Sequence, residues 1–238
     1  MKIIVLSITP YKEKDGIAKA ISENESLTFL ARGIKDPKSK NAALNNVLTV
    51  ADIELMDGNF AHPILKSSKP LFSPLKVDMD AKYLASLMTI DEMMLNLFPE
   101  DEQQTMFPYL EKAVDNLKAT NDWLMTLLQF MAHTVRMGGF QLEVNQCDMC
   151  GATKNIVTFS FSDGGFVCES CYQPEMERDL SKEQMILLRK IVNCPDYRLK
   201  SSDYKSGDLL VLFDKFRQYI EEAFGYHFKN MRLLIGSK

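Results

Sequence analysis

The first 78 residues alternate between short apolar runs and polar breaks, a pattern typical of β-strands. An open sheet of several short strands would leave two unpaired edges. Closing the sheet into a barrel removes these edges, so the pattern favours a small closed sheet. An Asp57-Gly58 pair predicts a turn after the fourth run. The predicted strands lie within residues 2–9, 17–22, 26–34, 46–56 and 62–69.

From residue 79 the apolar spacing changes to i, i+3, i+4, which is typical of amphipathic helices. Ser181 and Gln184 are spaced for a capping box at the start of one of them. No helix could bury its apolar stripe alone, so we expect the helices to pack as one bundle. The predicted helices lie within 79–98, 106–117, 121–137, 181–194 and 208–224.

Composition indicates a folded chain of one large or two ordinary domains. Of 238 residues, 46% are hydrophobic and 25% are charged, which excludes a disordered tail protein. The most apolar helical stretch, 123–132, is about half the length of a membrane span. The apolar start at 1–6 is too short for a signal-peptide core, so we expect a cytoplasmic protein with no membrane partner.

Charge is unevenly distributed along the chain. The net charge is −4, and residues 81–146 hold four basic and nine acidic side chains. By contrast, residues 32–40 hold four cations and only Asp36 as an acid. A polyanion responds to the field at one surface, so this segment is either a polyanion-binding loop or an ordinary solvated one. The cations are Arg32, Lys35, Lys38 and Lys40.

Four of the five cysteines form two C-x2-C pairs separated by 17 residues. Two such knuckles can supply four thiolates to one ion, and a site closed by four thiolates is structural rather than catalytic. A β-rich run at 155–161 and the turn at 163–165 lie between the pairs, which predicts a zinc ribbon over about 144–174. The predicted Zn²⁺ ligands are Cys147, Cys150, Cys168 and Cys171.

Other interpretations of these cysteines are weaker. Disulfides need an oxidising compartment, and a redox C-x-x-C is one pair at the start of a helix. Iron also binds four sulfurs, so spacing alone leaves zinc and iron open. The fifth cysteine, Cys194, is expected to be a small buried apolar residue.

The sequence offers little for catalysis. It has no G-x-x-x-x-G-K-[ST] loop and no G-x-S-x-G turn. His62, His133 and His227 lie far apart, and His133 is expected to be a packed or surface residue. No nucleophile, general base or phosphate cradle stands out, so a binding protein is favoured over an enzyme.

Several short motifs also occur in a fixed order along the chain. The most specific are Cys147-Asp148-Met149-Cys150-Gly151 and the stretch from Phe159-Ser160 through Gly164-Gly165 to Cys168. Shorter ones are Tyr11-Lys12-Glu13-Lys14-Asp15, Ala31-Arg32-Gly33 with Lys38-Ser39-Lys40, Gly138-Gly139-Phe140, and Phe224-Gly225-Tyr226 with Lys229. In this order they resemble the RecO family of bacterial DNA repair and recombination mediators.

The resemblance implies an α+β protein with an OB-fold barrel at 1–78 and a helical domain at 79–238 that contains the ribbon. It implies a non-enzymatic, nucleoid-associated mediator that binds single- and double-stranded DNA and anneals complementary strands. Its partners would be RecR and the single-strand DNA-binding protein (SSB), and it would help to load RecA.

An OB-fold of this kind binds strands with cations and stacked aromatic rings. Lys12 and Lys14, on an earlier loop, join the four cations of 32–40 as the predicted DNA-binding residues. Candidate stacking residues are Tyr11, Phe29 and Phe72, although Phe29 is expected to face the barrel core. The alternatives are a zinc-ribbon scaffold for protein interactions with little DNA affinity and, less favoured, a metal-dependent enzyme.

Overall fold

The computed structural model describes residues 1–56, 61–176, 178 and 180–235. The chain divides into two compact units, 1–121 and 122–238. The first compact unit contains both the barrel and the helices up to residue 121. The predicted domain boundary at residue 78 stays a prediction.

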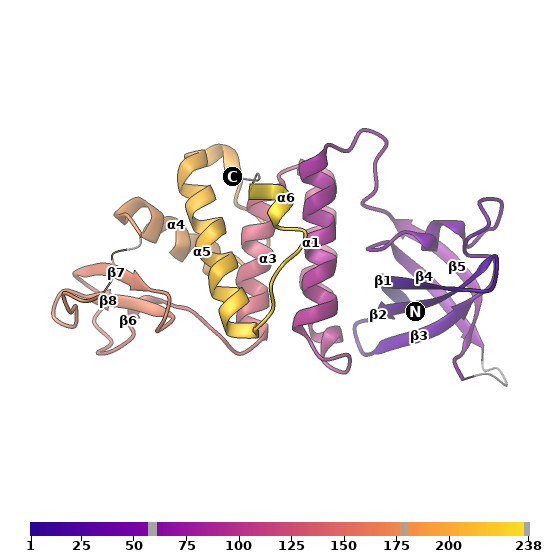
Figure 1. The fold of residues 1–238 in the computed structure, drawn as a ribbon, viewed down its shortest axis with the longest axis horizontal. Helices are drawn as coiled ribbons and strands as arrows, with labels where there is room; N and C mark the ends of the chain where they lie inside the picture. Colours follow the sequence, from indigo (N-terminus) through magenta and orange to yellow (C-terminus); the bar gives the residue numbers. More distant parts are fainter. Residues whose placement is uncertain (57–60, 177, 179, 236–238) are drawn as a thin grey trace. The chain divides into compact units, whose positions relative to one another are not determined.

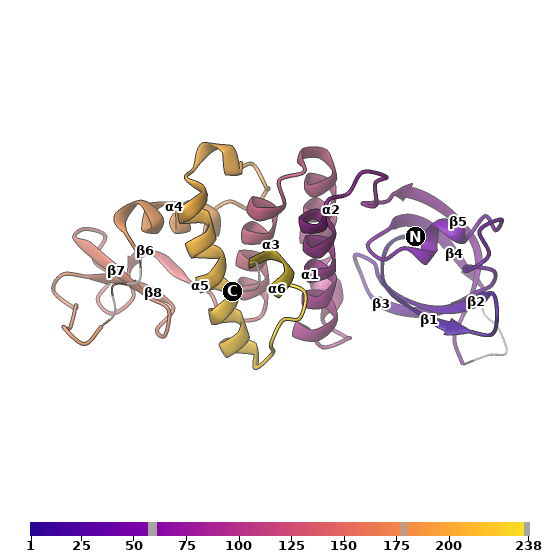
Figure 2. The ribbon, with the colours of Figure 1, turned by 45° about the horizontal axis from the view of Figure 1, so that its top comes forward.

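The first unit contains a β-barrel. Five strands in its described part close in the order β1-β2-β3-β5-β4. Neighbours are antiparallel except β3 and β5, which meet in parallel at Leu30 and Ile64. Figure 2 shows the strands curving round into a ring. The strands are β1 (Lys2–Tyr11), β2 (Asp15–Ile21), β3 (Ser26–Ala31), β4 (Val50–Met56) and β5 (Ile64–Phe72).

These strands confirm the predicted small closed sheet; the predicted Asp57-Gly58 turn lies outside the described residues. Alternate side chains of each strand fill the barrel, as Ala18 and Ala20 do from β2 and Phe29 and Ala31 from β3. β1 is buried on both faces over residues 3–6, because α1 packs against it, and this explains its continuous apolar run. Each fully buried Ile or Leu contributes about 1.5–3 kcal/mol.

Two helices complete the first unit. α1 (Ala81–Leu97) begins where the Asp80 side chain accepts a hydrogen bond from the Tyr83 N–H, at 2.7 Å. A short 3₁₀ turn (Gln103–Met106) leads into α2 (Phe107–Thr120). α2 ends at Asn121, whose left-handed backbone places its N–H on the Leu117 carbonyl.

In the second unit, α3, α4 and α5 pack against one another. Ser181 and Gln184 form the predicted capping box. α5 begins two residues before the predicted Asp208 and ends at Gly225, which is left-handed. The helices are α3 (Trp123–Met137), α4 (Lys182–Val192), α5 (Ser206–Phe224) and the short α6 (Arg232–Ile235), which the sequence did not predict. Judged by length and hydropathy, no helix in the described part of the chain could cross a membrane.

The ribbon lies between α3 and α4 in the sequence. Figure 1 shows it as a small sheet of β6 (Glu143–Cys147), β7 (Ile156–Ser160) and β8 (Gly165–Cys168). The β7–β8 hairpin was predicted, whereas β6, which pairs in parallel with β8, was not. In β6 only Val144 and Cys147 are buried, so its sequence carries almost no alternation of apolar and polar residues.

Candidate nucleic-acid interface and metal centre

The β1–β2 turn and the loop after β3 lie side by side, because Gly16 at the start of β2 pairs with Ala31 at the end of β3. The Lys35 N–H donates to the Lys14 carbonyl at 3.0 Å. The Gly33 N–H donates to the Asp15 carboxylate at 2.8 Å. We call these two loops, residues 12–15 and 32–40, the basic edge.

Hydrogen bonds also hold the second loop of the basic edge to the barrel. The Asn41 side chain donates to the Arg32 carbonyl at 3.2 Å and accepts from the Ser68 hydroxyl of β5 at 2.9 Å. Gly33 has a φ of 66°, a left-handed conformation that a glycine adopts without strain. These bonds tie the loop to the barrel, so its cations stand on a hydrogen-bonded frame.

The basic edge brings together all six cations that the sequence analysis selected, and all six are exposed. Lys14 forms an ion pair with Asp36, with Nζ 3.0 Å from Oδ2. This hydrogen bond, and a weaker one from the Lys38 N–H, hold the pKa of Asp36 below its ordinary value. Among the described residues, Lys35, Lys38 and Lys40 form no ion pair with an acidic side chain.

The candidate stacking residues differ in their surroundings. Phe29 is fully buried in the barrel core, as expected, and so is not available for stacking. Phe72 lies at the end of β5, with the Lys118 ammonium 4.2 Å from its ring centroid. Tyr11 is 39% exposed, and the Lys12 ammonium lies 5.4 Å from its ring centroid. Tyr11 is therefore the candidate ring directly beside the basic edge.

A cavity of about 200 Å³ adjoins Tyr11, and its other lining residues are Ile17, Leu30, Ala61 and His62. His62 was not among the predicted binding residues. No sequence signal places it beside Tyr11, because the two segments meet only when the barrel closes. Ile17 and Leu30 are paired across β2 and β3 and alternate with the core residues Ala18 and Phe29.

The four cysteines of the ribbon come together as predicted. Their Sγ atoms all lie within 4.8 Å of one another, which fits four thiolates around one tetrahedral ion. All five cysteines of the chain are free thiols, so the disulfide alternative finds no support. The Cys168 N–H points to the Cys147 Sγ at 3.4 Å, and Gly151, with a φ of 74°, closes the first knuckle. These residues can hold a metal ion.

The protonation of these thiols reflects their crowding. Burial raises the pKa of Cys147, but the backbone N–H groups of Cys168, Cys150 and Met149 outweigh it and lower that pKa to about 6. Hydrogen bonds with the Cys150 and Cys168 thiols raise the pKa of Cys171 to about 12. Four thiolates this close repel one another, and a bound divalent cation would compensate that repulsion.

Two expectations about single residues are settled. Cys194 is half-buried rather than buried, because its Sγ points to the Asp196 carboxylate at 3.5 Å beside exposed Pro195. His133 is packed inside the second unit, 2% exposed, with its ring 5.6 Å from that of Tyr197.

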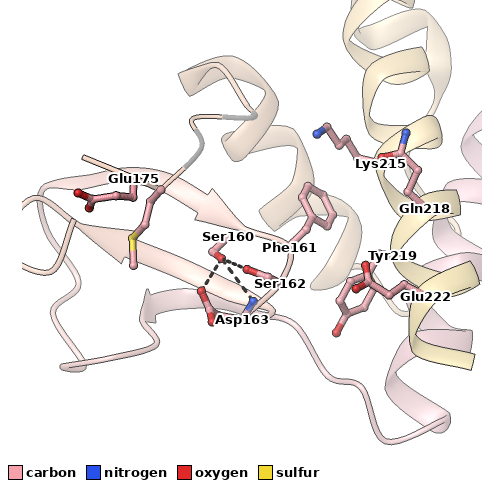
Figure 3. A pocket seen from close by; sticks show the side chains of 10 residues that line it. Ser160, Phe161, Ser162, Asp163, Glu175, Lys215, Gln218, Tyr219 and Glu222 are labelled. Atoms are coloured by element: carbon pink, nitrogen blue, oxygen red, sulfur yellow. Dashed lines mark hydrogen bonds between the residues drawn. The ribbon is translucent and has the colours of Figure 1, made fainter. Parts of the chain in front are cut away.

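A second cavity, of about 470 Å³, lies between the ribbon and α5 (Figure 3). Phe161 and Tyr219 contribute aromatic rings 6.1 Å apart. Burial, with a smaller effect of Glu222, raises the pKa of Tyr219. Carboxylates outnumber cations among the lining side chains, with Asp163, Glu175 and Glu222 against Lys215.

Comparisons with known proteins agree with this architecture. Residues 1–62 match the family model described as recombination protein O N terminal, and residues 78–232 match recombination protein O C terminal. The N-terminal match, together with the closed barrel, confirms the expected OB-fold.

Two curated relatives, each named DNA repair protein RecO, are similar over nearly the whole chain. The protein of Halalkalibacterium halodurans is 25% identical over 235 residues, covering 97% of this chain and 92% of that protein. The protein of Bacillus subtilis is 25% identical over 237 residues, covering 97% of this chain and 91% of that protein. The chain therefore belongs to the RecO family of DNA repair proteins.

Proposed function

We propose that this protein is a non-enzymatic mediator of DNA repair that binds single- and double-stranded DNA through the basic edge of its barrel. The observation that carries the proposal is the convergence of six exposed cations on two neighbouring, hydrogen-bonded loops. Lysine and arginine side chains neutralise phosphates and release counterions, so such an edge attracts DNA without regard to sequence. The net charge of −4 does not oppose this, because the field is local.

Strand annealing follows from the same chemistry. A protein that neutralises phosphates on two complementary strands lowers their repulsion and leaves the base edges free to pair. With RecR, such a mediator would help to load RecA onto single strands coated by the single-strand DNA-binding protein. We expect such a mediator to act in the cytoplasm, at the nucleoid.

The proposed metal is a structural Zn²⁺ held by Cys147, Cys150, Cys168 and Cys171. The four thiolates leave no open position for water, so the ion would stabilise the ribbon and take no part in chemistry.

The test is fluorescence anisotropy of labelled single- and double-stranded oligonucleotides, titrated with the whole chain at several salt concentrations. We expect binding that weakens with salt and is lost when Arg32, Lys35, Lys38 and Lys40 are replaced together by Gln. The matched control replaces four exposed lysines of the second unit, Lys154, Lys182, Lys200 and Lys205, by Gln and should bind like the wild type. Equal binding by wild type and the fourfold variant would refute the assignment of the site.

A second candidate function is a zinc-ribbon scaffold for protein interactions with little DNA affinity of its own. The cavity between the ribbon and α5 favours it, because its excess of carboxylates suits a cationic protein segment. Absence of DNA binding at low salt, with a protein partner still recovered after nuclease treatment and lost in Glu222→Lys, would favour the scaffold.

A further inference from the structure

The cavity beside Tyr11 lies on the outer surface of the barrel. Ala18 and Phe29 belong to the barrel core. Their chain neighbours Ile17 and Leu30, which are paired across β2 and β3, point the opposite way because successive side chains of a strand alternate. The cavity floor is therefore an apolar patch on the outer face of β2 and β3.

Two segments far apart in the sequence supply the other lining residues. Tyr11 ends β1, just before the β1–β2 turn, and Ala61 and His62 precede β5. In OB-folds, the outer face of strands 2 and 3 and the loops on either side of it are where oligonucleotides and oligosaccharides bind. Between these two ligand classes, the charge around the cavity favours the polyanion.

The size and chemistry of the cavity suit one flat ring. Its volume of about 200 Å³ is smaller than the roughly 300–1,000 Å³ of pockets that take drug-sized ligands. Tyr11 and His62 contribute aromatic rings to the lining, and Ile17 and Leu30 contribute aliphatic side chains. Every nucleobase has a π-face, so stacking of this kind tolerates any sequence.

The neighbouring charges match the rest of a nucleotide. The Lys12 ammonium lies 5.4 Å from the Tyr11 ring centroid, so a phosphate next to a base on that ring would meet a cation. Lys12 adopts a φ of 57°, which is unusual for lysine and is fixed by the tight β1–β2 turn. Lys14 lies on the same turn, and the other four cations of the basic edge lie on the neighbouring loop after β3, which the Lys35 N–H ties to the Lys14 carbonyl.

We infer that this cavity receives one unpaired base of a DNA strand, stacked against Tyr11 and His62, while the basic edge holds the adjoining phosphates. The inference rests on the proposed function and adds a means of strand discrimination. A base inside a duplex is paired and stacked, and it must leave the helix before it can enter a pocket. The basic edge attracts both forms of DNA, whereas the cavity favours single strands.

The test uses a short oligothymidylate with a central 2-aminopurine, whose fluorescence falls when the base stacks on an aromatic ring. The whole chain should quench this probe. Tyr11→Ala should abolish the quenching and weaken single-strand binding about tenfold, as expected for loss of one stacked base, with duplex binding unchanged. Tyr11→Phe, which keeps the ring, should behave like the wild type, and His62→Ala should show a partial loss.

Tyr204→Ala is the matched control, because Tyr204 lies in the second unit with the Lys190 ammonium 5.3 Å from its ring centroid. Thermal unfolding of each variant reports whether the barrel is intact. If DNA binds but Tyr11→Ala leaves quenching and the single-to-double-strand ratio unchanged, the base pocket is refuted while the basic edge stands. If the wild type binds neither form of DNA, the proposed function fails as well.

Discussion

Three lysines of the basic edge offer a quantitative test of its electrostatics. Lys35, Lys38 and Lys40 are exposed and, among the described residues, form no ion pair, so each is available to a phosphate. The charge of Lys14 is compensated by the Asp36 carboxylate, 3.0 Å from its Nζ, so Lys14 contributes less to phosphate binding. With Lys12 and Arg32, about five contacts remain, and a single strand gives about −0.7 per contact in the slope of log affinity against log salt.

Replacement of the three lysines by Gln should therefore reduce the slope from about −3.5 to about −1.4. Over roughly a fourfold rise in salt, the wild type should lose about 100-fold in affinity and the triple variant about sevenfold. The assay is anisotropy of a labelled single strand across that salt range. The triple variant of Lys154, Lys182 and Lys200 carries the same change in net charge and should keep the wild-type slope.

The Lys14–Asp36 pair supplies a check of opposite sign. Asp36→Asn removes a negative charge from the basic edge and releases Lys14, so the slope should steepen by about 0.7 and binding should tighten at low salt. A slope that stayed near −3.5 in the lysine variant would refute the electrostatic role of these lysines. Weaker DNA binding by a folded Asp36→Asn variant would refute it as well.

Three further predictions concern stability. Removal of the proposed Zn²⁺ by a chelator, or Cys150→Ser, should unfold the ribbon and lower the thermal midpoint, because a structural metal site contributes its binding energy to folding. A Cβ added at Gly138 would overlap the Phe224 ring, which packs against the Phe140 ring with 4.9 Å between centroids. Gly138→Ala should therefore lower the free energy of unfolding in urea by about 1–3 kcal/mol. Burial raises the pKa of Asp91 to about 7, so the folded chain keeps a proton that the unfolded chain releases above about pH 4. Asp91 thus lowers stability as the pH rises from about 4 to about 7, and Asp91→Asn should add about 1–3 kcal/mol near pH 8 and nothing near pH 3.

For each of the three stability predictions, the same measurement can also give a result that contradicts it. An unchanged thermal midpoint after complete metal removal would contradict a structural ion. Wild-type stability of Gly138→Ala would mean that the Phe224 ring moves aside without loss. A gain in Asp91→Asn that is the same near pH 3 and pH 8 would show that the carboxylate charge is not the cause.

The sequence by itself determined most of the local elements and the cluster of four cysteines that could hold a metal ion. The spacing of apolar residues, together with turn and capping residues, located the barrel strands and the longer helices, including the helix with the Ser181 capping box. These signals depend only on neighbours along the chain. The cysteine spacing identified the four thiols before their Sγ atoms were known to lie within 4.8 Å of one another. Short motifs in order pointed to the family that the comparisons show.

Tertiary structure decided what lies next to what. Strand β6 forms because β8 offers it a partner, since its own sequence hardly alternates. Lys14 meets Asp36 across 22 residues because strand pairing joins the two loops. Tyr11 and His62 share a cavity only because the barrel closes. Sequence patterns report the period and the burial of each element, whereas strand order and closure set the distances between elements, and binding surfaces depend on those distances.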